Sequence, residues 1–425
     1  MIDTLKMKVA ELVGHRLVDG LFLLLVASGL ALYFVDKHLG HGLVVGAAII
    51  AILCALLGKP IHFLTRDRVA YIWPLALFLF VLSLGMGFLV HGTESDLRRL
   101  HEAFEICLIG GFLFFLFSSR PPVFEGFLPW LLALGAGITG VIMLLAWEKV
   151  GFSRRMWQGT RMINISAGTQ ILLVGALLGF LIGQKLSWKS WVLVLAIALG
   201  SVSIFASGSR GAWLGLVAVV GVSGFLLVLR LRMSWKVTVP FVLVLTLGLL
   251  ALLQTPQVQQ RIAHGQSDMH QYFSGGKRTT SLGLRLEMWR SAWDGFIENP
   301  LTGMGAASLG ERWQGIEHDY HLVSFSPHVH NDFLEAAHSR GLLGLVSVSL
   351  ILFTPIYFGW RYRKRVYGKV LVTACSGFLL VGLFDTFLVM KFALFYYVVL
   401  VSVLLGLLYG DSERFKPSPV AQAGD

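Results

Sequence analysis

The chain alternates between long apolar runs and short polar segments along most of its length. A transmembrane α-helix needs about 20 predominantly apolar residues to cross a hydrocarbon core about 30 Å thick. Runs close to that length predict about twelve spans, at residues 18–35, 41–57, 70–90, 104–118, 125–146, 164–184, 190–206, 212–229, 237–253, 341–359, 369–387 and 391–409. Twelve spans would place both termini on the same side of the membrane.

One polar interruption, residues 254–340, is much longer than the others and separates the ninth predicted span from the tenth. We therefore expect one membrane domain over residues 1–425, with this segment as a single large loop that contains helices and part of an active site. Residues 411–425 are expected to form a polar tail. Seven of the thirteen histidines lie between residues 254 and 339, so the loop is the first place to look for chemistry.

Composition and charge agree with this pattern. The chain is 56% hydrophobic and only 14% charged, whereas soluble domains carry roughly 25% charged residues. The expected fold class is an all-α polytopic membrane protein. If the N-terminus is cytoplasmic, Lys and Arg gather in the inner segments, most densely in residues 361–369, as cytoplasmic loops require. The net charge of +11 therefore reflects membrane topology, and nucleic acid is not needed as a partner.

This orientation places both termini in the cytoplasm and the long loop in the periplasm of a bacterial inner membrane. Three arginines between the fifth and sixth spans then lie on the outer side, which the charge rule disfavours: Arg154, Arg155 and Arg161. Such exceptions suggest an anion outside and make the three candidate substrate-binding residues. Attraction to the phosphates of anionic lipids explains them equally well.

Arg210 is the sharpest exception to the charge rule. It lies in Ser207-Gly-Ser-Arg-Gly211, between two apolar runs that leave too few residues for a solvated loop. Ionisable residues at membrane depth are usually functional. The small neighbours would let a diphosphate approach the backbone, and a guanidinium offers a planar fork of donors to phosphate oxygens. The alternative is an arginine that reaches the headgroups or pairs with a carboxylate.

Residues 284–300 predict an amphipathic helix in the long loop. Leu286, Trp289, Trp293 and Phe296 recur at helical spacing, and Asn299-Pro300 is a stop signal. The helix is expected to lie on the membrane surface or on the helix bundle. Arg285 precedes Trp289 by one turn and can project from the same side. A solvated salt bridge is the alternative role for this arginine.

The run from Ser326 to Gly344 leads directly into the tenth span. Asp332 and Glu335 have the spacing of a capping box, which would place His330 and Asn331 just ahead of a helix N-terminus. That end of a helix repels cations and favours neutral imidazole, which can accept a proton.

The alternative for this run is a metal site. His328 and His330 could bind an ion, with His318, His321 or His338 as further ligands. The spacings match no zinc pattern and no cysteine assists, so no metal is expected. His338 lies beside Glu335 on the predicted helix. It is a candidate substrate-binding residue, although a buried structural histidine is the commoner case.

Three short motifs carry a resemblance to a known family: Ser-Gly-Ser-Arg-Gly around Arg210, the Arg-Leu context of Arg285 with its following Trp, and His330-Asn331 followed by Gly341-x-x-Gly344. With the span count and the late loop, the chain resembles the bacterial O-antigen ligases. These share a core domain with O-antigen polymerases and protein O-oligosaccharyltransferases.

The resemblance implies a glycosyltransferase of the GT-C class that needs no metal or other cofactor. Its donor would be glycan on undecaprenyl diphosphate, and its acceptor the core sugar of lipid A. Arg210 and Arg285 would bind the diphosphate and His330 would be the essential histidine, acting as general base in an inverting transfer. Asn331 would orient the imidazole or contact a sugar. His328 and His338 are also candidate substrate-binding residues, but the motifs that carry the resemblance assign them no role.

Two other classes of function fit parts of the same pattern, namely transfer of glycan to a different acceptor and transport. A polymerase or a protein O-oligosaccharyltransferase differs only in its acceptor, and the compact chain without an additional C-terminal periplasmic domain favours the ligase. A transporter or lipid flippase could also have twelve spans and intramembrane arginines. Transporters usually show broken helices in paired halves, whereas this chain shows one lopsided loop.

Overall fold

In the computed structural model the described residues are 16–32, 37–57, 68–119, 125–150, 163–184, 187–188, 190–231, 239–240, 243, 254–274, 280–313 and 328–414. All secondary structure in these residues is helical. Six helices are long and apolar enough to cross a membrane: α4 (Ile72–His91), α5 (Glu94–Ser119), α6 (Leu128–Val150), α9 (Arg210–Leu231), α14 (Asp332–Arg361) and α16 (Lys391–Arg414).

Five shorter helices are also apolar: α2 (Arg16–Leu32), α3 (Lys37–Leu57), α7 (Ile163–Gly183), α8 (Ser190–Ala206) and α15 (Val366–Gly382). Short 3₁₀ turns, η1 (Arg68–Tyr71) and η2 (Glu125–Phe127), precede α4 and α6. The chain is therefore a polytopic membrane protein, as predicted. The ninth predicted span, 237–253, lies almost wholly outside the described residues, so the total of twelve stays a prediction.

The last helix, α16, forms the centre of the bundle. It is apolar on all sides, and 94% of its most apolar stretch is buried against α5, α7 and α15. The neighbouring α7 and α15 approach each other closely because α7 presents Gly175 and Gly179 at the contact. A Cβ atom there would lie 2.6 and 2.4 Å from the Cα atoms of Ala374 and Val370. Small residues let backbones pack closely where lipid supplies no hydrophobic driving force.

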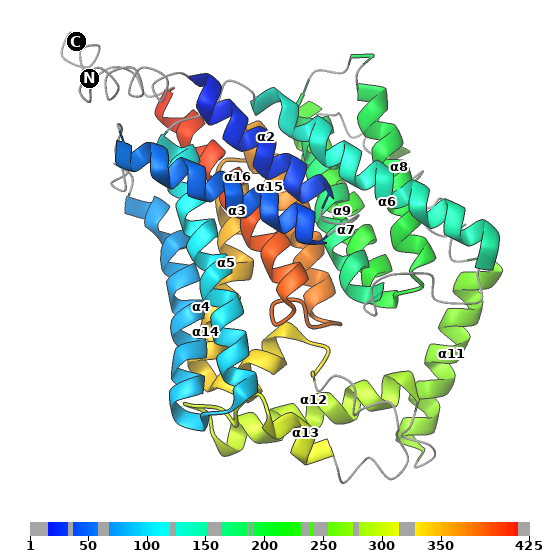
Figure 1. The fold of residues 1–425 in the computed structure, drawn as a ribbon. Helices are drawn as coiled ribbons and strands as arrows, with labels where there is room; N and C mark the ends of the chain where they lie inside the picture. The colour runs from blue at the N-terminus through cyan, green and yellow to red at the C-terminus, as the bar shows by residue number, and fades with distance from the viewer. Residues whose placement is uncertain are drawn as a thin grey trace, which may run out of the picture.

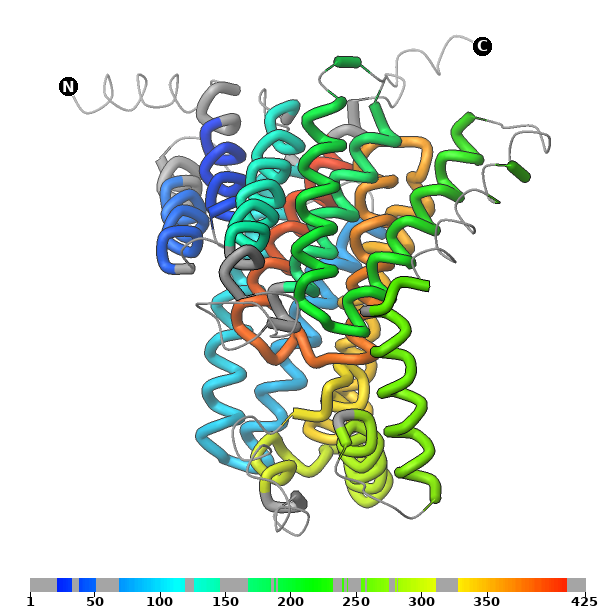
Figure 2. The backbone as a smooth tube through the Cα atoms, turned by 90° about the vertical axis from the view of Figure 1, so that its right-hand side faces the viewer, coloured from blue at the N-terminus to red at the C-terminus, as the bar shows by residue number. Residues whose placement is uncertain are grey.

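The long polar segment lies at the end of the bundle opposite the start of α2 and the end of α16 (Figure 1). It contains α11 (Pro256–Phe273), α12 (Ser281–Glu298) and the short α13 (Ser308–Trp313). Figure 2 shows α11 running away from the bundle, and Figure 1 shows α12 crossing below it. α12 packs on the first turns of α14. The predicted loop with helices is thus a helical cap over the end of α14.

The face that α12 buries differs from the predicted aromatic stripe. Its buried residues are Met288, Ala292 and Gly295, whereas Trp293 is 50% exposed. Small residues determine which face of α12 can pack on α14. A Cβ atom at position 295 would lie 2.5 Å from the ring of His338, so a larger residue would not fit there. Within the predicted stripe, Trp289 packs against the buried cluster that contains Met288, whereas Trp293 faces outward.

A kink at Gly341 attaches α14 to the cap. Gly341 has φ 62° and ψ −152° inside the helix. The next amide, Leu342, donates to the carbonyl of Pro300 at 2.7 Å instead of continuing the helical ladder. The amide of Met304 donates in turn to the carbonyl of His338 at 2.7 Å. The turn that follows α12 is thus bound to the backbone of α14 on both sides of the kink.

Replacing Gly341 with alanine should lower the free energy of unfolding by about 2 kcal/mol or more, because this backbone region is essentially restricted to glycine. The added Cβ atom would also lie 2.5 Å from the backbone carbonyl of Leu301. Thermal unfolding of the purified protein in detergent measures the effect. Gly310→Ala on α13 is the matched control, since no heavy atom lies within 4 Å of its Cβ position. Equal losses of stability in the two variants would contradict the role given to the kink.

Candidate functional site

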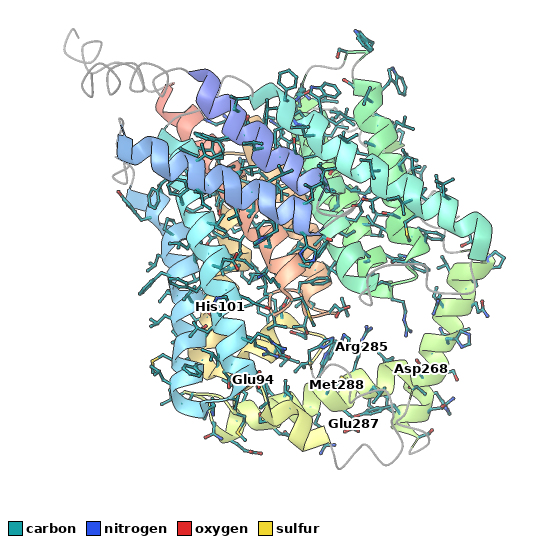
Figure 3. The ribbon with its side chains drawn as sticks, viewed as in Figure 1. Glu94, His101, Asp268, Arg285, Glu287 and Met288 are labelled. Carbon is teal, nitrogen blue, oxygen red and sulfur yellow. The ribbon has the colours of Figure 1, made fainter. Side chains whose placement is uncertain are left out.

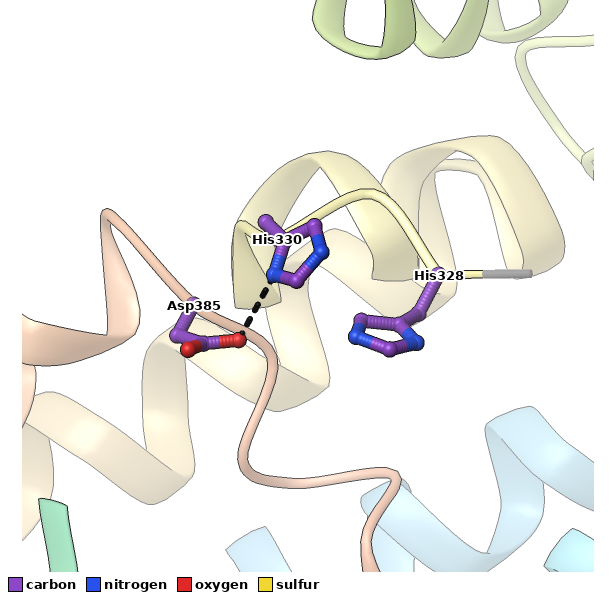
Figure 4. Close-up of side chains that lie close together, drawn as sticks. All are labelled: His328, His330 and Asp385. Atoms are coloured by element: carbon purple, nitrogen blue, oxygen red, sulfur yellow. Dashed lines mark hydrogen bonds and ion pairs between the residues drawn. The ribbon is translucent and has the colours of Figure 1, made fainter. Parts of the chain in front are cut away.

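His330 and Asp385 form the centre of the candidate site. His330 Nδ1 lies 2.8 Å from Asp385 Oδ1 (Figure 4). Burial alone would raise the pKa of Asp385, but the hydrogen bond from His330 and the charges of His330, His328 and Arg285 outweigh it and lower that pKa to about 2. An ionised carboxylate only accepts hydrogen bonds. Nδ1 of His330 therefore donates to the carboxylate, which leaves Nε2 as the ring nitrogen that can accept a proton.

The backbone of His330 supports this arrangement. Its φ of 55° lies in the left-handed region, and it is the one non-glycine residue with positive φ in the described part of the chain. Such a conformation costs about 1–3 kcal/mol and is found where function requires it. Its side chain is 24% exposed, whereas that of Asp385 is 6% exposed. The imidazole thus contacts a buried carboxylate through Nδ1, while the ring as a whole is partly open to solvent.

Hydrogen bonds join the segment before α14 to the turn between α15 and α16. The amide of Asn331 donates to Thr386 Oγ1 at 3.1 Å, and its side-chain nitrogen donates to the carbonyl of Leu383 at 3.1 Å. Asp332 Oδ1 accepts from two amides of the same turn, those of Phe387 and Leu388, at 2.9 Å each. Asp385 is therefore held opposite His330 by the backbone of a turn that α14 itself fixes.

The helix cap differs by one residue from the predicted capping box. Asn331, and not Asp332, is the N-cap of α14, and its Oδ1 accepts from the amides of Phe333 and Leu334. The reason is that Asp332 is already engaged with the α15–α16 turn. Asn331 therefore positions the start of α14, and its side-chain atoms are used within the protein.

Glu335 holds the His330 segment from the other side. It is fully buried, pairs with Arg99 of α5 at 2.8 Å and accepts from the amide of Val329 at 2.9 Å. Removing one partner of such a buried pair would leave an uncompensated charge. The residue before His330 is thereby fixed to both α5 and α14. Neither Arg99 nor this role of Glu335 was predicted.

His328 lies next to His330, with their ring centroids 4.3 Å apart. Burial first, and the neighbouring His330 second, lower the pKa of His328 to about 4. Its imidazole is therefore neutral near pH 7. The ligand atoms of His328, His330 and Asp385 all lie within 4.8 Å of one another. Two imidazoles and a carboxylate are ligand types that zinc accepts, so this set could also hold a metal ion.

α12 brings Arg285 toward this centre. The helix is held by Trp289, whose Nε1 donates to the carbonyl of Val329 at 3.0 Å and whose ring centroid is 6.4 Å from that of Phe384. Arg285 lies one turn earlier and rises from α12 toward the bundle (Figure 3). Its charge acts on the carboxyl of Asp385. The charge of Arg285 thus reaches the carboxylate that His330 contacts.

Arg210 is the first residue of α9 and lies against α11. Its guanidinium is 3.9 Å from the carboxylate of Asp268, too long for a hydrogen bond. Its side chain is 33% exposed, so its donors remain accessible. The next residue, Gly211, packs on Phe384, because a Cβ atom there would lie 3.0 Å from the Cβ of Phe384. Arg210 therefore adjoins the same turn that carries Asp385.

His338, a predicted substrate-binding residue, contacts the cap and not the His330–Asp385 pair. Both ring nitrogens of His338 are within hydrogen-bond distance of the cap, at 3.3 Å from the carbonyl of Ala292 and 3.0 Å from Ser308 Oγ. With 0% exposure, His338 joins α14 to α12 and α13. The arginines 154, 155 and 161 lie outside the described residues.

Sequence reasoning missed Asp385. The residue was assigned to the eleventh span, 369–387, whereas α15 ends at Gly382 and Asp385 stands in the following turn. A lone carboxylate in an otherwise apolar run was the available signal, since acidic residues at membrane depth are rare and usually functional. Arg261 of α11 was also missed. Its guanidinium would lie 3.2 Å from a Cβ atom at Gly208, beside Arg210.

Comparison with known proteins points to one family. A Haemophilus influenzae protein of uncharacterized function is 26% identical over 81% of this chain and 85% of its own length. An Escherichia coli K12 O-antigen ligase is 28% identical over 34% of each chain, so the match spans about a third of that relative. The sequence model of the O-antigen ligase family matches residues 195–349, a segment that contains Arg210, Arg285 and His330. Residues 195–349 of this chain are therefore similar to the O-antigen ligase family.

Proposed function

We propose that the protein is an O-antigen ligase of the bacterial inner membrane. It would transfer glycan from undecaprenyl diphosphate to the core oligosaccharide of lipid A on the periplasmic side, as a metal-independent inverting glycosyltransferase of the GT-C class. The observation that carries the proposal is the 2.8 Å contact between His330 Nδ1 and Asp385 Oδ1. It leaves Nε2 of His330 free to act as a base, in a family whose members ligate O-antigen.

In this mechanism His330 Nε2 takes the proton of the acceptor hydroxyl as its oxygen attacks C1 of the donor sugar. The C1–O bond to the diphosphate breaks as the new C1–O bond forms, and the lipid diphosphate leaves with the bonding electrons. The imidazolium that results is stabilised by the carboxylate of Asp385. Attack from the side opposite the leaving group inverts the configuration at C1.

Arg210 and Arg285 would bind the diphosphate. Departure of the lipid diphosphate builds negative charge, which preorganised cations can stabilise most strongly away from bulk water. Both arginines adjoin the turn around Phe384, through Gly211 and through Trp289. Arg261 adds a further positive charge beside Arg210. In this arrangement α9 and α12 supply the arginines that bind the diphosphate. The segment just before α14 supplies His330, which accepts the proton.

The direct test is a transfer assay with purified protein, lipid-linked glycan and lipopolysaccharide core. Glycan attached to the core identifies a ligase. Extension of the lipid-linked glycan identifies a polymerase, and attachment to protein an oligosaccharyltransferase. Movement of the lipid-linked glycan across proteoliposomes without any transfer would indicate a flippase. A deletion strain should make lipopolysaccharide without O-antigen while polymerised glycan accumulates on its lipid carrier.

Replacing Arg210 or Arg285 with glutamine should lower the rate of transfer by ~10²–10³, the usual effect of removing one donor at a developing negative charge. Lysine keeps the charge but loses the fork, and a charge-assisted hydrogen bond lost in this way lowers the rate by about 10–100-fold. The matched control is Arg290→Lys on the same helix, where the guanidinium is exposed and pairs with Asp294 at 4.0 Å. Full activity of Arg210→Lys and Arg285→Lys would rule out bidentate phosphate recognition.

Treatment with EDTA should leave the transfer rate unchanged, because the proposed base and cations need no metal. The cluster of His328, His330 and Asp385 makes this a necessary test. If EDTA abolishes transfer and Zn²⁺ or Mg²⁺ restores it, the cluster is a metal site and His330 is a ligand. His328→Ala adds a second readout, since a metal site needs both imidazoles whereas the base mechanism needs only His330.

A further inference from the structure

A basic cavity of about 350 Å³ lies between the end of α9 and the turn that joins α14 to α15. Its lining consists of Leu226, Leu229, Arg230, Arg363, Lys364 and Lys369. α14 has 30 residues, and at 1.5 Å per residue it is about 45 Å long. The cavity is at the end of α14 opposite His330, so it is separate from the proposed diphosphate site.

Among the side chains that the structure describes, the cations of this cavity have no acidic partner. Four cations line it and no carboxylate does, and none of the four forms an ion pair with a described carboxylate. Lys369 is only 6% exposed. Its Nζ donates to the carbonyls of Lys364 and Arg365 at 2.9 and 3.4 Å. An ammonium has three donors, so one remains for a ligand. Like charges gathered in this way are stable when an anion joins them.

One wall of the cavity is apolar and continues along the membrane-spanning part of α9. Leu226 is 2% exposed and Leu229 is 46% exposed. Beside them, the rings of Phe225 and Trp360 stack at 6.1 Å between centroids and remain 54% and 42% exposed. Arg363 lies over the same Trp360 ring at 4.6 Å. A cationic pocket with an apolar border fits an amphiphile whose phosphate enters the pocket and whose chains follow α9.

We propose that this cavity binds the phosphate headgroup of an anionic phospholipid from the leaflet at this end of the bundle. Basic pockets between membrane helices bind such headgroups. The guanidinium of Arg363, oriented by its contact with Trp360 and its hydrogen bond to the Trp360 carbonyl at 3.2 Å, supplies a fork for phosphate oxygens. Lys364 and Lys369 supply point charges from the adjoining turn and helix.

Native mass spectrometry of the purified full chain in detergent tests the site. The probes are phosphatidylglycerol, phosphatidylcholine with the same acyl chains, and inorganic phosphate. Arg363→Gln with Lys364→Gln should weaken phosphatidylglycerol binding by about thirtyfold, since each cation near a headgroup contributes roughly fivefold to sixfold. The matched control is Arg361→Gln with Arg365→Gln. It removes the same charge from the same turn, but these side chains lie against Tyr362 at 5.9 and 5.8 Å and do not line the cavity.

Weaker binding in the first double variant and unchanged binding in the control support the site. Equal weakening in both, or in neither, overturns it. Comparing the three probes on the wild-type protein provides an independent test that requires no variant. Phosphatidylcholine retained as strongly as phosphatidylglycerol would show that charge does not select the lipid, and inorganic phosphate bound as tightly would show that the ligand is not a lipid.

Discussion

Replacing His330 with alanine should lower the rate of glycan transfer by ~10²–10⁴, the range by which a positioned general base accelerates proton transfer. The expectation rests on the free Nε2 of a ring whose Nδ1 is 2.8 Å from Asp385. The measurement is transfer by purified protein from lipid-linked glycan to lipopolysaccharide core under saturating donor. Donor binding, measured separately, should change little because the arginines remain.

His101→Ala is the control for this experiment. His101 is exposed on α5, and its removal should leave the rate unchanged. Thermal unfolding of both variants shows whether the fold is retained. We expect it to be, because His330 is partly exposed and alanine, like histidine, can adopt this strained backbone conformation. Undiminished transfer by His330→Ala would remove the base assignment and, with it, the mechanism proposed above.

Replacing Asp385 with asparagine should lower kcat by at least ~10², and the loss reaches ~10⁴ in a comparable carboxylate–histidine pair. Asparagine keeps the shape, but its amide can donate to Nδ1 and so stabilise the tautomer in which Nε2 already carries the proton. It also removes the charge that stabilises the imidazolium. The KM for the donor should change little, because Asp385 is a positioning residue that acts through His330.

Asp294→Asn provides the matched control, since that carboxylate is exposed on α12 and should not affect transfer. Asp385→Glu, which restores the charge at a slightly different position, should recover part of the activity. A parallel loss of kcat and donor affinity in Asp385→Asn, with no recovery in Asp385→Glu, would mean that the carboxylate only supports the fold of the turn.

The helices were predictable from sequence because apolar runs long enough to cross a membrane have few alternatives to helix. The same holds for the helix before Asn299-Pro300 and for the helix that leads into the tenth span. His330, Arg210 and Arg285 could be selected because each stands out locally, by a motif or by a charge where charge is disfavoured. In the structure His330 contacts Asp385, whereas Arg210 and Arg285 adjoin this turn through Gly211 and Trp289, which pack on Phe384.

Asp385 could not be paired with His330 from sequence, because 55 residues separate them and only the packing of α14, α15 and α16 makes them neighbours. The packed face of α12 was predicted only in part, for a related reason. Hydrophobic spacing identifies large apolar side chains, whereas the contact with His338 required small residues at Ala292 and Gly295. Which side of a helix is buried depends on what lies opposite, and that partner was not visible in the sequence.

Asp385 stands in the turn between α15 and α16, so the proposed site draws on two different parts of the protein. α16 is the most enclosed of the six long apolar helices in the described residues, and the turn that carries the carboxylate leads into it. Arg285 stands instead on α12, which lies beyond the end of the bundle (Figure 1). In the proposed mechanism, the proton acceptor therefore depends on the packing of the bundle, whereas one of the two diphosphate-binding cations depends on the placement of the cap.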